Sequence, residues 1–562
     1  MLASFPWPAA DLSPFSLPLS ATPETALPLT DALFQAFEPT NLNPDSAPPV
    51  GTDPWDTLLF EPLDPLPLSP PSSEGHRSES TTNSEWVPPN DKQVELVDIF
   101  FERVQWYFPL FHRQSLTASV KAGELRQSSP LLFYSVLSLA ARFHPDPVIQ
   151  GAQLNFHDKS RALYEATSHL PDRPLETLQA AACIVLQAFT FGDHSIAALS
   201  LSKAWRQTVA LGFHHVDSPF RVVLPGITAP DASEWREKEQ RRRILWTLFV
   251  LDKAMCFKAG LVHTIDDRQI SAFLPMSEDV FQNSQTPPDL SDAILYPHNP
   301  KMLISTLQNV VRQKQPGNMM QFIILAHSLT ARISDHMFSP VFGQDDPQHQ
   351  LERAQLDQDL TQMRLILPRY ATDLAAANHA DFAHVIWLRL TMDVNTISLY
   401  HRPQTTPSAT LDTQDATGLV EEDRWQHCVA AARNTVRLIR EASRVSTDLL
   451  LNPYLAASLF TSARILAIEY ILSSPAADGP NKDQEIQREA LRADLDVMML
   501  SFDRLSEALG GVLHKFRVGL LYQLRLDAAA VRAIKAGGTR GLLESCGKWP
   551  MARDIEGIEE TR

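Results

Sequence analysis

The chain has 562 residues, 44% hydrophobic and 20% charged, with a formal net charge of −17 and four cysteines. This length exceeds what one compact core usually holds, so more than one unit or a large helical array is expected. The cysteines lie far apart without a CxxC pair, which excludes a disulfide framework and a locally built zinc finger.

Residues 1–90 differ in composition from the remainder of the chain. They hold 18 of the 42 prolines and 12 acidic residues against one basic residue, Arg77, and so carry 11 of the 17 net negative charges. Such a segment buries too little apolar surface to offset the entropy of ordering. It is predicted to be a disordered acidic, proline-rich arm.

The first residues, MLASFPWPAADLSPF, have no basic region and are interrupted by prolines, so they do not resemble a secretory signal. No apolar run approaching ~18 residues is expected. These patterns predict a soluble intracellular protein that does not enter a membrane.

Helical periodicity begins after Val94 and recurs along most of the chain. Apolar residues at positions 97, 100, 101, 104 and 108 share one helix face, and Pro109 ends it. Strand-like alternation is scarce, so the predicted class is all-α, a large multi-helix core behind the arm. Further helices are expected over 129–144, 175–191, 195–212, 234–257, 300–335, 350–378, 382–400, 422–446, 453–474, 485–508 and 516–536.

Three consecutive arginines stand in EKEQRRRILWTLFVLDK, residues 237–253. Acidic residues three and four positions earlier can pair with them, and the following apolar run leaves little exposed helix for a nucleic-acid duplex. The three arginines are therefore expected to form ion pairs at the start of a core helix rather than bind DNA. A nuclear localisation signal remains an alternative.

Residues 234–275 resemble the signature of the fungal transcription factor middle homology domain. In that family an arginine-rich helix start leads to an aromatic-aliphatic run, an acidic-basic pair, a glycine, an Ile-x-Asp element and a proline. The matching positions, for which the resemblance implies a structural role, are Arg241, Arg242, Arg243, Trp246, Asp252, Lys253, Gly260, Ile265, Asp266 and Pro275.

Three more stretches are similar to parts of the same domain: 97–116, 200–218 and 397–403. The resemblance therefore places the middle homology domain over 91–400 and makes 401–562 a C-terminal helical extension of the same core.

Most members of this family carry a six-cysteine zinc cluster that reads the DNA major groove. Here no cysteine precedes Cys183, and without thiolates such a module does not fold. The expectation is that DNA is reached indirectly, through other transcription regulators and coactivators, with a homo- or heterodimer as an option. No cofactor and no metal site are expected.

The arm contains two clusters of large apolar residues among acids. If such a cluster folds on contact, it presents an apolar face to a partner groove, as an activation segment does. A solvated linker is the alternative. The candidate partner-binding residues are Leu33, Phe34, Phe37, Trp55, Leu58, Leu59 and Phe60.

Other polar residues do not form a recognisable site. His214-His215 and the isolated His112, His144 and His157 are expected to be loop or interface residues rather than metal ligands. The pairs Asp266-Asp267 and Asp345-Asp346 lack the third carboxylate of an all-α terpene cyclase. The nucleotide, metalloprotease and hydrolase motifs are also missing, so an all-α enzyme is only a remote alternative.

The sequence and the resemblance together predict a nuclear regulator of a fungal metabolic pathway, either a secondary-metabolite gene cluster or nutrient utilisation. The competing hypothesis is an interaction scaffold or inhibitor that titrates a full-length zinc-cluster regulator without activating transcription.

Overall fold

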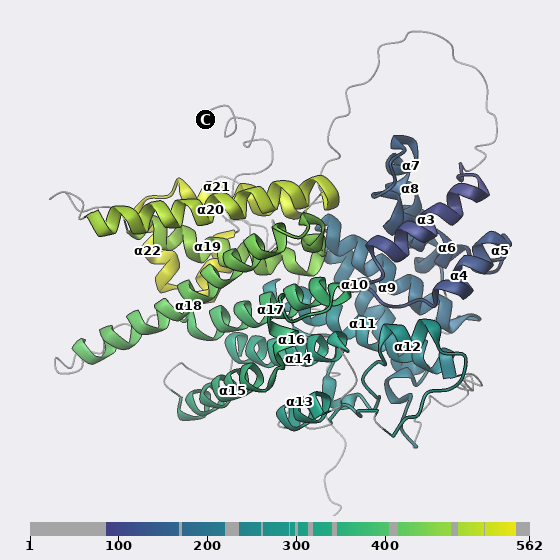
Figure 1. The fold of residues 1–562 in the computed structure, drawn as a ribbon, viewed down its shortest axis with the longest axis horizontal. Coiled ribbons are helices and arrows are strands. Elements are labelled where there is room, and N and C mark those ends of the chain that lie inside the picture. Colours follow the sequence, from purple (N-terminus) through teal and green to yellow (C-terminus); the bar gives the residue numbers. More distant parts are fainter. Residues whose placement is uncertain are drawn as a thin grey trace, which may run out of the picture. The chain divides into compact units, whose positions relative to one another are not determined.

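The computed structural model describes residues 86–167, 171–219, 235–259, 262–291, 293–297, 302–312, 318–339, 346–403, 414–473, 482–510 and 512–546. Throughout these ranges the regular structure is helical, and the only β pairing is two isolated bridges, Phe273–Leu295 and Pro403–Gly537 (Figure 1). This confirms the all-α class for the described residues.

Helices make up most of the described chain before residue 260. The α-helices are α3 (Asn90–Arg103), α4 (Arg113–Lys121), α5 (Glu124–Ser128), α6 (Pro130–Ala141), α7 (Pro147–Gly151), α8 (Gln153–Glu165), α9 (Pro174–Phe191), α10 (His194–Ala210) and α11 (Trp235–Ala259), with a 3-10 turn, η2 (Phe213–His215).

The remaining helices follow with loops of varied length. They are η3 (Asp267–Gln269), α12 (Glu278–Asn283), α13 (Leu303–Arg312), α14 (Met319–Phe338), α15 (Pro347–Ile366), α16 (Arg369–Thr372), η5 (His379–Asp381), α17 (Phe382–Tyr400), α18 (Gln414–Ser443), η6 (Thr447–Leu450), η7 (Pro453–Leu455), α19 (Ala456–Leu472), α20 (Lys482–Leu509), α21 (Val512–Leu524), α22 (Ala528–Ala536) and α23 (Gly538–Cys546).

Local signals explain several of these boundaries. Pro174 occupies the first turn of α9, where its missing N–H costs nothing, and Gly192 ends the helix with a φ of 79°. Asp193 then caps α10, since its carboxylate accepts a hydrogen bond from the Ile196 N–H at 3.0 Å. The expected helices over 175–191 and 195–212 are confirmed to within a few residues.

Three expected helices were too long. The helix expected over 300–335 is two helices, α13 and α14, and the residues between them include Pro316-Gly317. The helix expected over 350–378 ends at Ile366, two residues before Pro368. The helix expected over 516–536 stops at Leu524 and restarts after Asp527, which caps α22.

Two segments are long and apolar enough to cross a membrane, Pro174–Phe191 and Pro453–Leu472. The expectation that no such run exists was therefore wrong. Of the residues in these segments 78% and 72% are buried inside the protein, which is how core helices of a folded protein behave.

One apolar cluster extends from Leu96 on α3 to Leu542 on α23. Helix α17 packs against α14, α15, α18 and α19, and it is buried on nearly all sides. Its Trp387 ring stacks on Tyr454 with centroids 4.8 Å apart and planes inclined by 8°. The described part of the expected C-terminal extension, 401–562, thus shares its buried surface with the helices before it.

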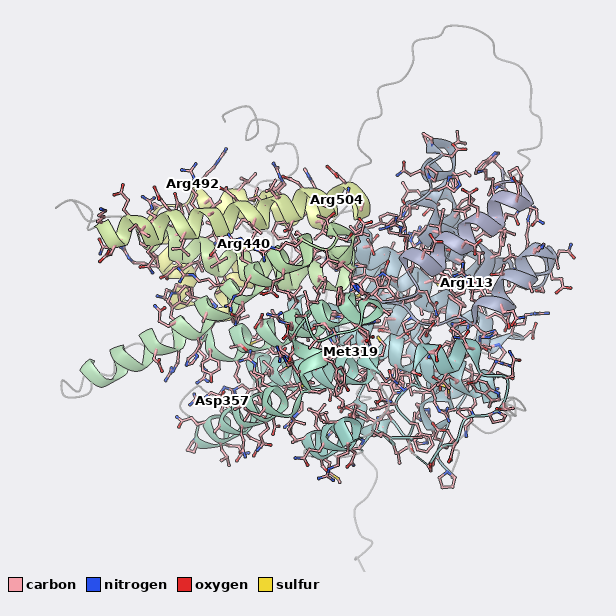
Figure 2. The ribbon with its side chains drawn as sticks, in the orientation of Figure 1. Arg113, Met319, Asp357, Arg440, Arg492 and Arg504 are labelled. Carbon is pink, nitrogen blue, oxygen red and sulfur yellow. The ribbon has the colours of Figure 1, made fainter. Side chains whose placement is uncertain are left out.

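Charged side chains stand out along the exposed faces of the C-terminal helices (Figure 2). Arg440 of α18 pairs with Asp494 of α20 at 2.8 Å, and Arg504 of α20 pairs with Asp448 at 3.2 Å. Both arginines are nearly half exposed, so each pair contributes about 0–1 kcal/mol at most.

Candidate functional site: a buried arginine cluster

The residues expected to act in activation, together with Gly260 of the signature, lie outside the described residues. They are Leu33, Phe34, Phe37, Trp55, Leu58, Leu59, Phe60 and Gly260. The other signature residues are all described, and the three arginines, with Glu237, Glu239, Asp217 and Glu278, form a group termed here the arginine cluster.

Arg241, Arg242 and Arg243 occupy the second and third turns of α11, and each is only 3% exposed. Arg241 reaches back one helical turn, with its Nη2 2.5 Å from Glu237 Oε1. Its guanidinium also lies 4.9 Å from the centre of the Phe213 ring. The side chain therefore joins α11 to the turn η2 instead of facing solvent.

Arg242 binds Asp217 through a two-point fork, Nε to Oδ2 at 2.8 Å and Nη2 to Oδ1 at 2.6 Å. Its remaining nitrogen, Nη1, donates to Glu239 at 3.1 Å. Asp217 Oδ2 also accepts from the Phe273 N–H at 2.8 Å. Three chain segments meet at this guanidinium: the residues after η2, helix α11 and the loop near residue 273.

Arg243 is held by four oxygens on three segments. Its Nε donates to Glu239 at 3.0 Å, and its Nη2 donates to the Met276 carbonyl at 2.9 Å. Its Nη1 contacts the Pro109 carbonyl at 3.0 Å and Glu278 at 2.5 Å. Since Pro109 is 134 positions away, this arginine ties the first helical region to α11.

In the arginine cluster, burial disfavours the charged forms of the side chains, and pairing between opposite charges favours them. Burial by itself would raise the pKa of Asp217, but the hydrogen bonds and charge of Arg242 bring that pKa below its usual value. Desolvation likewise opposes the charge on Arg242, yet the two carboxylates around it raise its pKa further. The guanidinium and the Asp217 carboxylate are thus both charged inside the protein.

Trp246 lies one turn further along α11 and contacts Phe273, which also contacts Arg242. Its indole N–H donates to the Phe273 carbonyl at 2.8 Å, and its ring lies 5.0 Å from Tyr296 and 5.5 Å from Phe249, centre to centre. The buried indole therefore has a polar partner, which removes the cost of an unsatisfied N–H.

The acidic-basic pair of the signature organises the loop after α11. Asp252 is fully buried and accepts from the backbone N–H groups of Thr264 at 2.9 Å and Ile265 at 3.1 Å. Lys253 donates to Asp252 at 3.0 Å and to the Ile265 carbonyl at 2.5 Å. The Asp252 carboxylate and the Lys253 ammonium group thus hold the backbone of Thr264 and Ile265 against α11.

The last two signature residues follow Ile265 along the chain, and of these Asp266 is partly exposed whereas Pro275 is buried. Asp266 caps η3 and accepts from the Arg268 backbone and guanidinium groups. The carbonyl of Pro275 accepts from Asn318 at 2.5 Å and Gln321 at 3.1 Å, joining the loop to the start of α14. The structure therefore brings the described signature residues together from α11 to Pro275.

A solvent-open depression of about 960 Å³ lies beside the arginine cluster, between α11, α12, α13 and α14. Its lining residues include Glu239, Arg242, Phe322 and Tyr370. What the cluster offers chemically is rigidity: its three guanidinium groups are neutralised by carboxylates and are not presented to a phosphate backbone.

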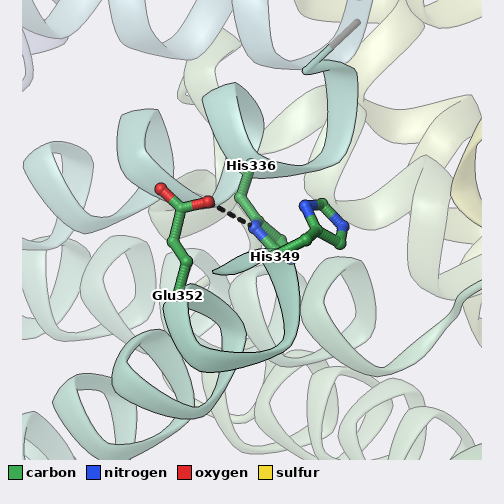
Figure 3. A group of neighbouring side chains, drawn as sticks. All are labelled: His336, His349 and Glu352. Carbon is green, nitrogen blue, oxygen red and sulfur yellow. Dashed lines mark hydrogen bonds and ion pairs between the residues drawn. The ribbon is translucent and has the colours of Figure 1, made fainter. Parts of the chain in front are cut away.

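Ligating side chains also gather away from the arginine cluster. His336 at the end of α14 and His349 and Glu352 at the start of α15 place their donor atoms within 4.8 Å of one another (Figure 3). The sequence reasoning missed this group. Its local signal is the His-x-x-Glu spacing at 349–352, but the position of His336 depends on how α14 packs against α15.

The histidines that the sequence singled out have other roles. His112 caps α4 and contacts the Gln282 carbonyl at 3.2 Å, while His214 and His215 stack on each other with ring centres 4.0 Å apart. His144 and His157 are buried, and burial lowers the pKa of His157 to about 4.

Residues 97–366 match the family model described as the fungal specific transcription factor domain. Similar curated proteins include the citrinin biosynthesis transcriptional activator ctnR of Monascus purpureus, 24% identical over 34% of this chain and 33% of that protein. The ascochitine biosynthesis cluster transcriptional regulator of Didymella fabae is 23% identical over 34% and 33%. The azaphilone cluster-specific transcription factor azaR of Aspergillus niger is 25% identical over 40% and 49%.

The chain matches only about a third of the length of the first two relatives. No solved structure matches this chain. The family match covers the arginine cluster, the Asp252–Lys253 pair and Pro275, which is the region where the sequence resemblance was strongest. Residues 97–366 of this chain therefore constitute a fungal specific transcription factor domain.

Proposed function

We propose that the chain is a transcription regulator of a fungal secondary-metabolite gene cluster and that it acts in the nucleus. The observation that carries this proposal is the domain match over 97–366, whose relatives are named as regulators of citrinin, ascochitine and azaphilone production. The structure supports a regulatory body, since α11 uses its three consecutive arginines for contacts inside the protein.

The proposed mechanism is recruitment through other proteins. Arg241, Arg242 and Arg243 form ion pairs with four carboxylates, of which Asp217 and Glu239 are buried, so these three arginines offer no basic face for DNA. Cys183 and Cys428 are buried in α9 and α18, and burial raises the pKa of the Cys428 thiol to about 12, which disfavours the thiolate that zinc requires. A partner regulator would bring the body to DNA, and the acidic arm would engage coactivators.

The test fuses the full chain to an unrelated DNA-binding module and measures a reporter gene. Activation is expected, and it should fall when Phe34, Phe37, Trp55 and Leu58 are all replaced by Ala, because the apolar face of the arm is then lost. The matched control replaces Gln35, Asn41, Asn43 and Thr57 by Ala in the same arm and should leave activation unchanged.

Silence of the unmodified fusion at normal protein levels would support the scaffold or inhibitor hypothesis instead. Indirect DNA contact has its own test: chromatin occupancy of the native chain with and without candidate partner regulators. Tight, selective binding of the purified chain to a defined duplex would contradict recruitment. Imaging a fluorescently tagged chain tests the nuclear location.

A further inference from the structure

Two histidines and a glutamate meet where α14 ends and α15 begins, outside the arginine cluster. His336 Nδ1 lies 2.9 Å from Glu352 Oε2, and the rings of His336 and His349 are 3.9 Å apart, centre to centre. Figure 3 shows the carboxylate of Glu352 directed at the His336 ring, with His349 beside it. Among the residues that the structure describes, this is the one group of three potential ligands within 4.8 Å.

Local structure fixes where these side chains point. Asp346 caps α15 by accepting from the Gln348 N–H at 2.7 Å, so the first turn begins at Pro347. His349 and Glu352 are three residues apart and therefore share one face of that helix. His336, in the last turn of α14, faces them because α14 packs against α15.

The donor set suits one metal class. Two imidazole nitrogens and one carboxylate oxygen make a typical zinc set, with water in the fourth position of a tetrahedron. Ligand distances of about 2.0–2.2 Å place donor atoms roughly 3.3–3.5 Å apart. The His336–Glu352 pair, at 2.9 Å, must therefore open slightly, and donor atoms up to 4.8 Å apart must approach. The two rings are inclined by only 15°, and one must turn, because an imidazole binds a metal in its own plane.

Charges of both signs surround the proposed ligands. Glu352, whose side chain is 47% exposed, supplies one negative charge and already contacts His336. Arg353 and Arg402 also face His349 electrostatically and oppose a cation, so binding should be exchangeable rather than permanent.

We propose that His336, His349 and Glu352 bind one exchangeable Zn²⁺ ion that fastens the end of α14 to the start of α15. The consequence extends along the chain, since α14 packs against both α11, which carries the arginine cluster, and α17. The carbonyl of Met337, next to His336, accepts from the Arg540 guanidinium at 2.8 Å, which connects the same point to α23. Zinc would thus stiffen a junction between the family domain and the C-terminal helices.

The experiment titrates the purified full chain with Zn²⁺ by isothermal calorimetry and with Co²⁺ by visible absorption. One Zn²⁺ per chain is expected, with a Co²⁺ spectrum of a tetrahedral nitrogen-oxygen site. The variants His349→Ala and Glu352→Gln should each weaken binding by more than about 10-fold, since loss of outer-shell partners alone reaches that range. Both side chains lie at the helix surface, so these variants should fold.

The matched control is His215→Ala. His214 and His215 form a second stacked histidine pair, with planes inclined by 29°, but they do not belong to a three-ligand group in the described part of the chain. This variant should bind Zn²⁺ as the unmodified chain does. Absence of Zn²⁺ binding, or unchanged binding in the His349→Ala, Glu352→Gln double variant, would overturn the proposal.

Discussion

Arg242 and Asp217 are joined inside the protein by two parallel hydrogen bonds of 2.8 and 2.6 Å, and the arginine is 3% exposed. The pair spans 25 positions of sequence and brings the end of η2 against α11. Since the guanidinium also reaches Glu239, its planar shape, and not only its charge, determines the contact.

Replacing Arg242 by Lys tests that claim. A lysine ammonium cannot reach both Asp217 oxygens and Glu239 together, so the free energy of unfolding should fall by about 2–3 kcal/mol. Urea denaturation followed by tryptophan fluorescence measures the loss. Arg504→Lys is the control, because Arg504 is nearly half exposed, and it should change stability by less than about 0.5 kcal/mol.

Asp252 controls the loop after α11. Asp252→Asn leaves one carbonyl oxygen for the two N–H groups of Thr264 and Ile265, and its amide NH₂ faces donors. Hydrogen exchange of these two amides should accelerate by at least about tenfold, which corresponds to about 1.4 kcal/mol. Asp266→Asn, which alters an exposed turn of the same loop, should leave their protection in place. Equal effects in both variants would contradict the assigned role of Asp252.

Gly538 lies where the start of α23 touches the end of α17. It has a φ of 63°, and a Cβ atom there would stand 2.4 Å from the Arg402 carbonyl carbon and the Pro403 nitrogen. Gly538→Ala should lower stability by about 3 kcal/mol or more, the sum of backbone strain and steric overlap. Gly510→Ala has a similar φ of 66° with open space around it, and should cost only about 1–2 kcal/mol. Thermal unfolding of the two variants side by side separates strain from overlap.

The carboxyl group of Asp393 should make the free energy of unfolding depend on pH. Burial raises its pKa to about 7, against the opposing charges of Arg364 and Arg389. The folded state holds this proton up to about pH 7, whereas the unfolded chain releases it near pH 3.9, so stability falls as pH rises between these values. The slope from this residue is at most about 1.4 kcal/mol per pH unit.

Asp393→Asn mimics the protonated carboxyl and should remove that slope. The variant should match the unmodified protein near pH 4 and unfold at a higher temperature at pH 8, as measured by Tm across this range. A variant less stable than the unmodified protein at pH 8 would show that the carboxylate is stabilised there.

The sequence predicted those features that depend on neighbours along the chain. The all-α class, the positions of α9 and α10 and the domain match around residues 234–275 all follow from helical periodicity, caps and local motifs. The acids near the arginines were expected to pair with them, and Glu237 and Glu239 lie within hydrogen-bonding distance of them.

Features that depend on tertiary packing could not be predicted in this way. No local pattern connects Arg243 with the Pro109 carbonyl or His336 with Glu352, because those contacts require the helices to be placed first. The end of α21 near residue 525 was missed because apolar residues continue through it at Leu524 and Leu526, whereas Asp527 caps the next helix. Between α13 and α14 the sequence offered the signal Pro316-Gly317, which the expected helix over 300–335 ignored.

The family match stops at Ile366, yet the apolar cluster continues through α17 to α23. A recombinant fragment that ends at that residue would lack α17, which packs against α14. The Ile and Phe side chains of α14 that α17 covers would then be exposed to water. Such a fragment should precipitate, and an early stop codon after this point should yield a null allele rather than a shorter working regulator.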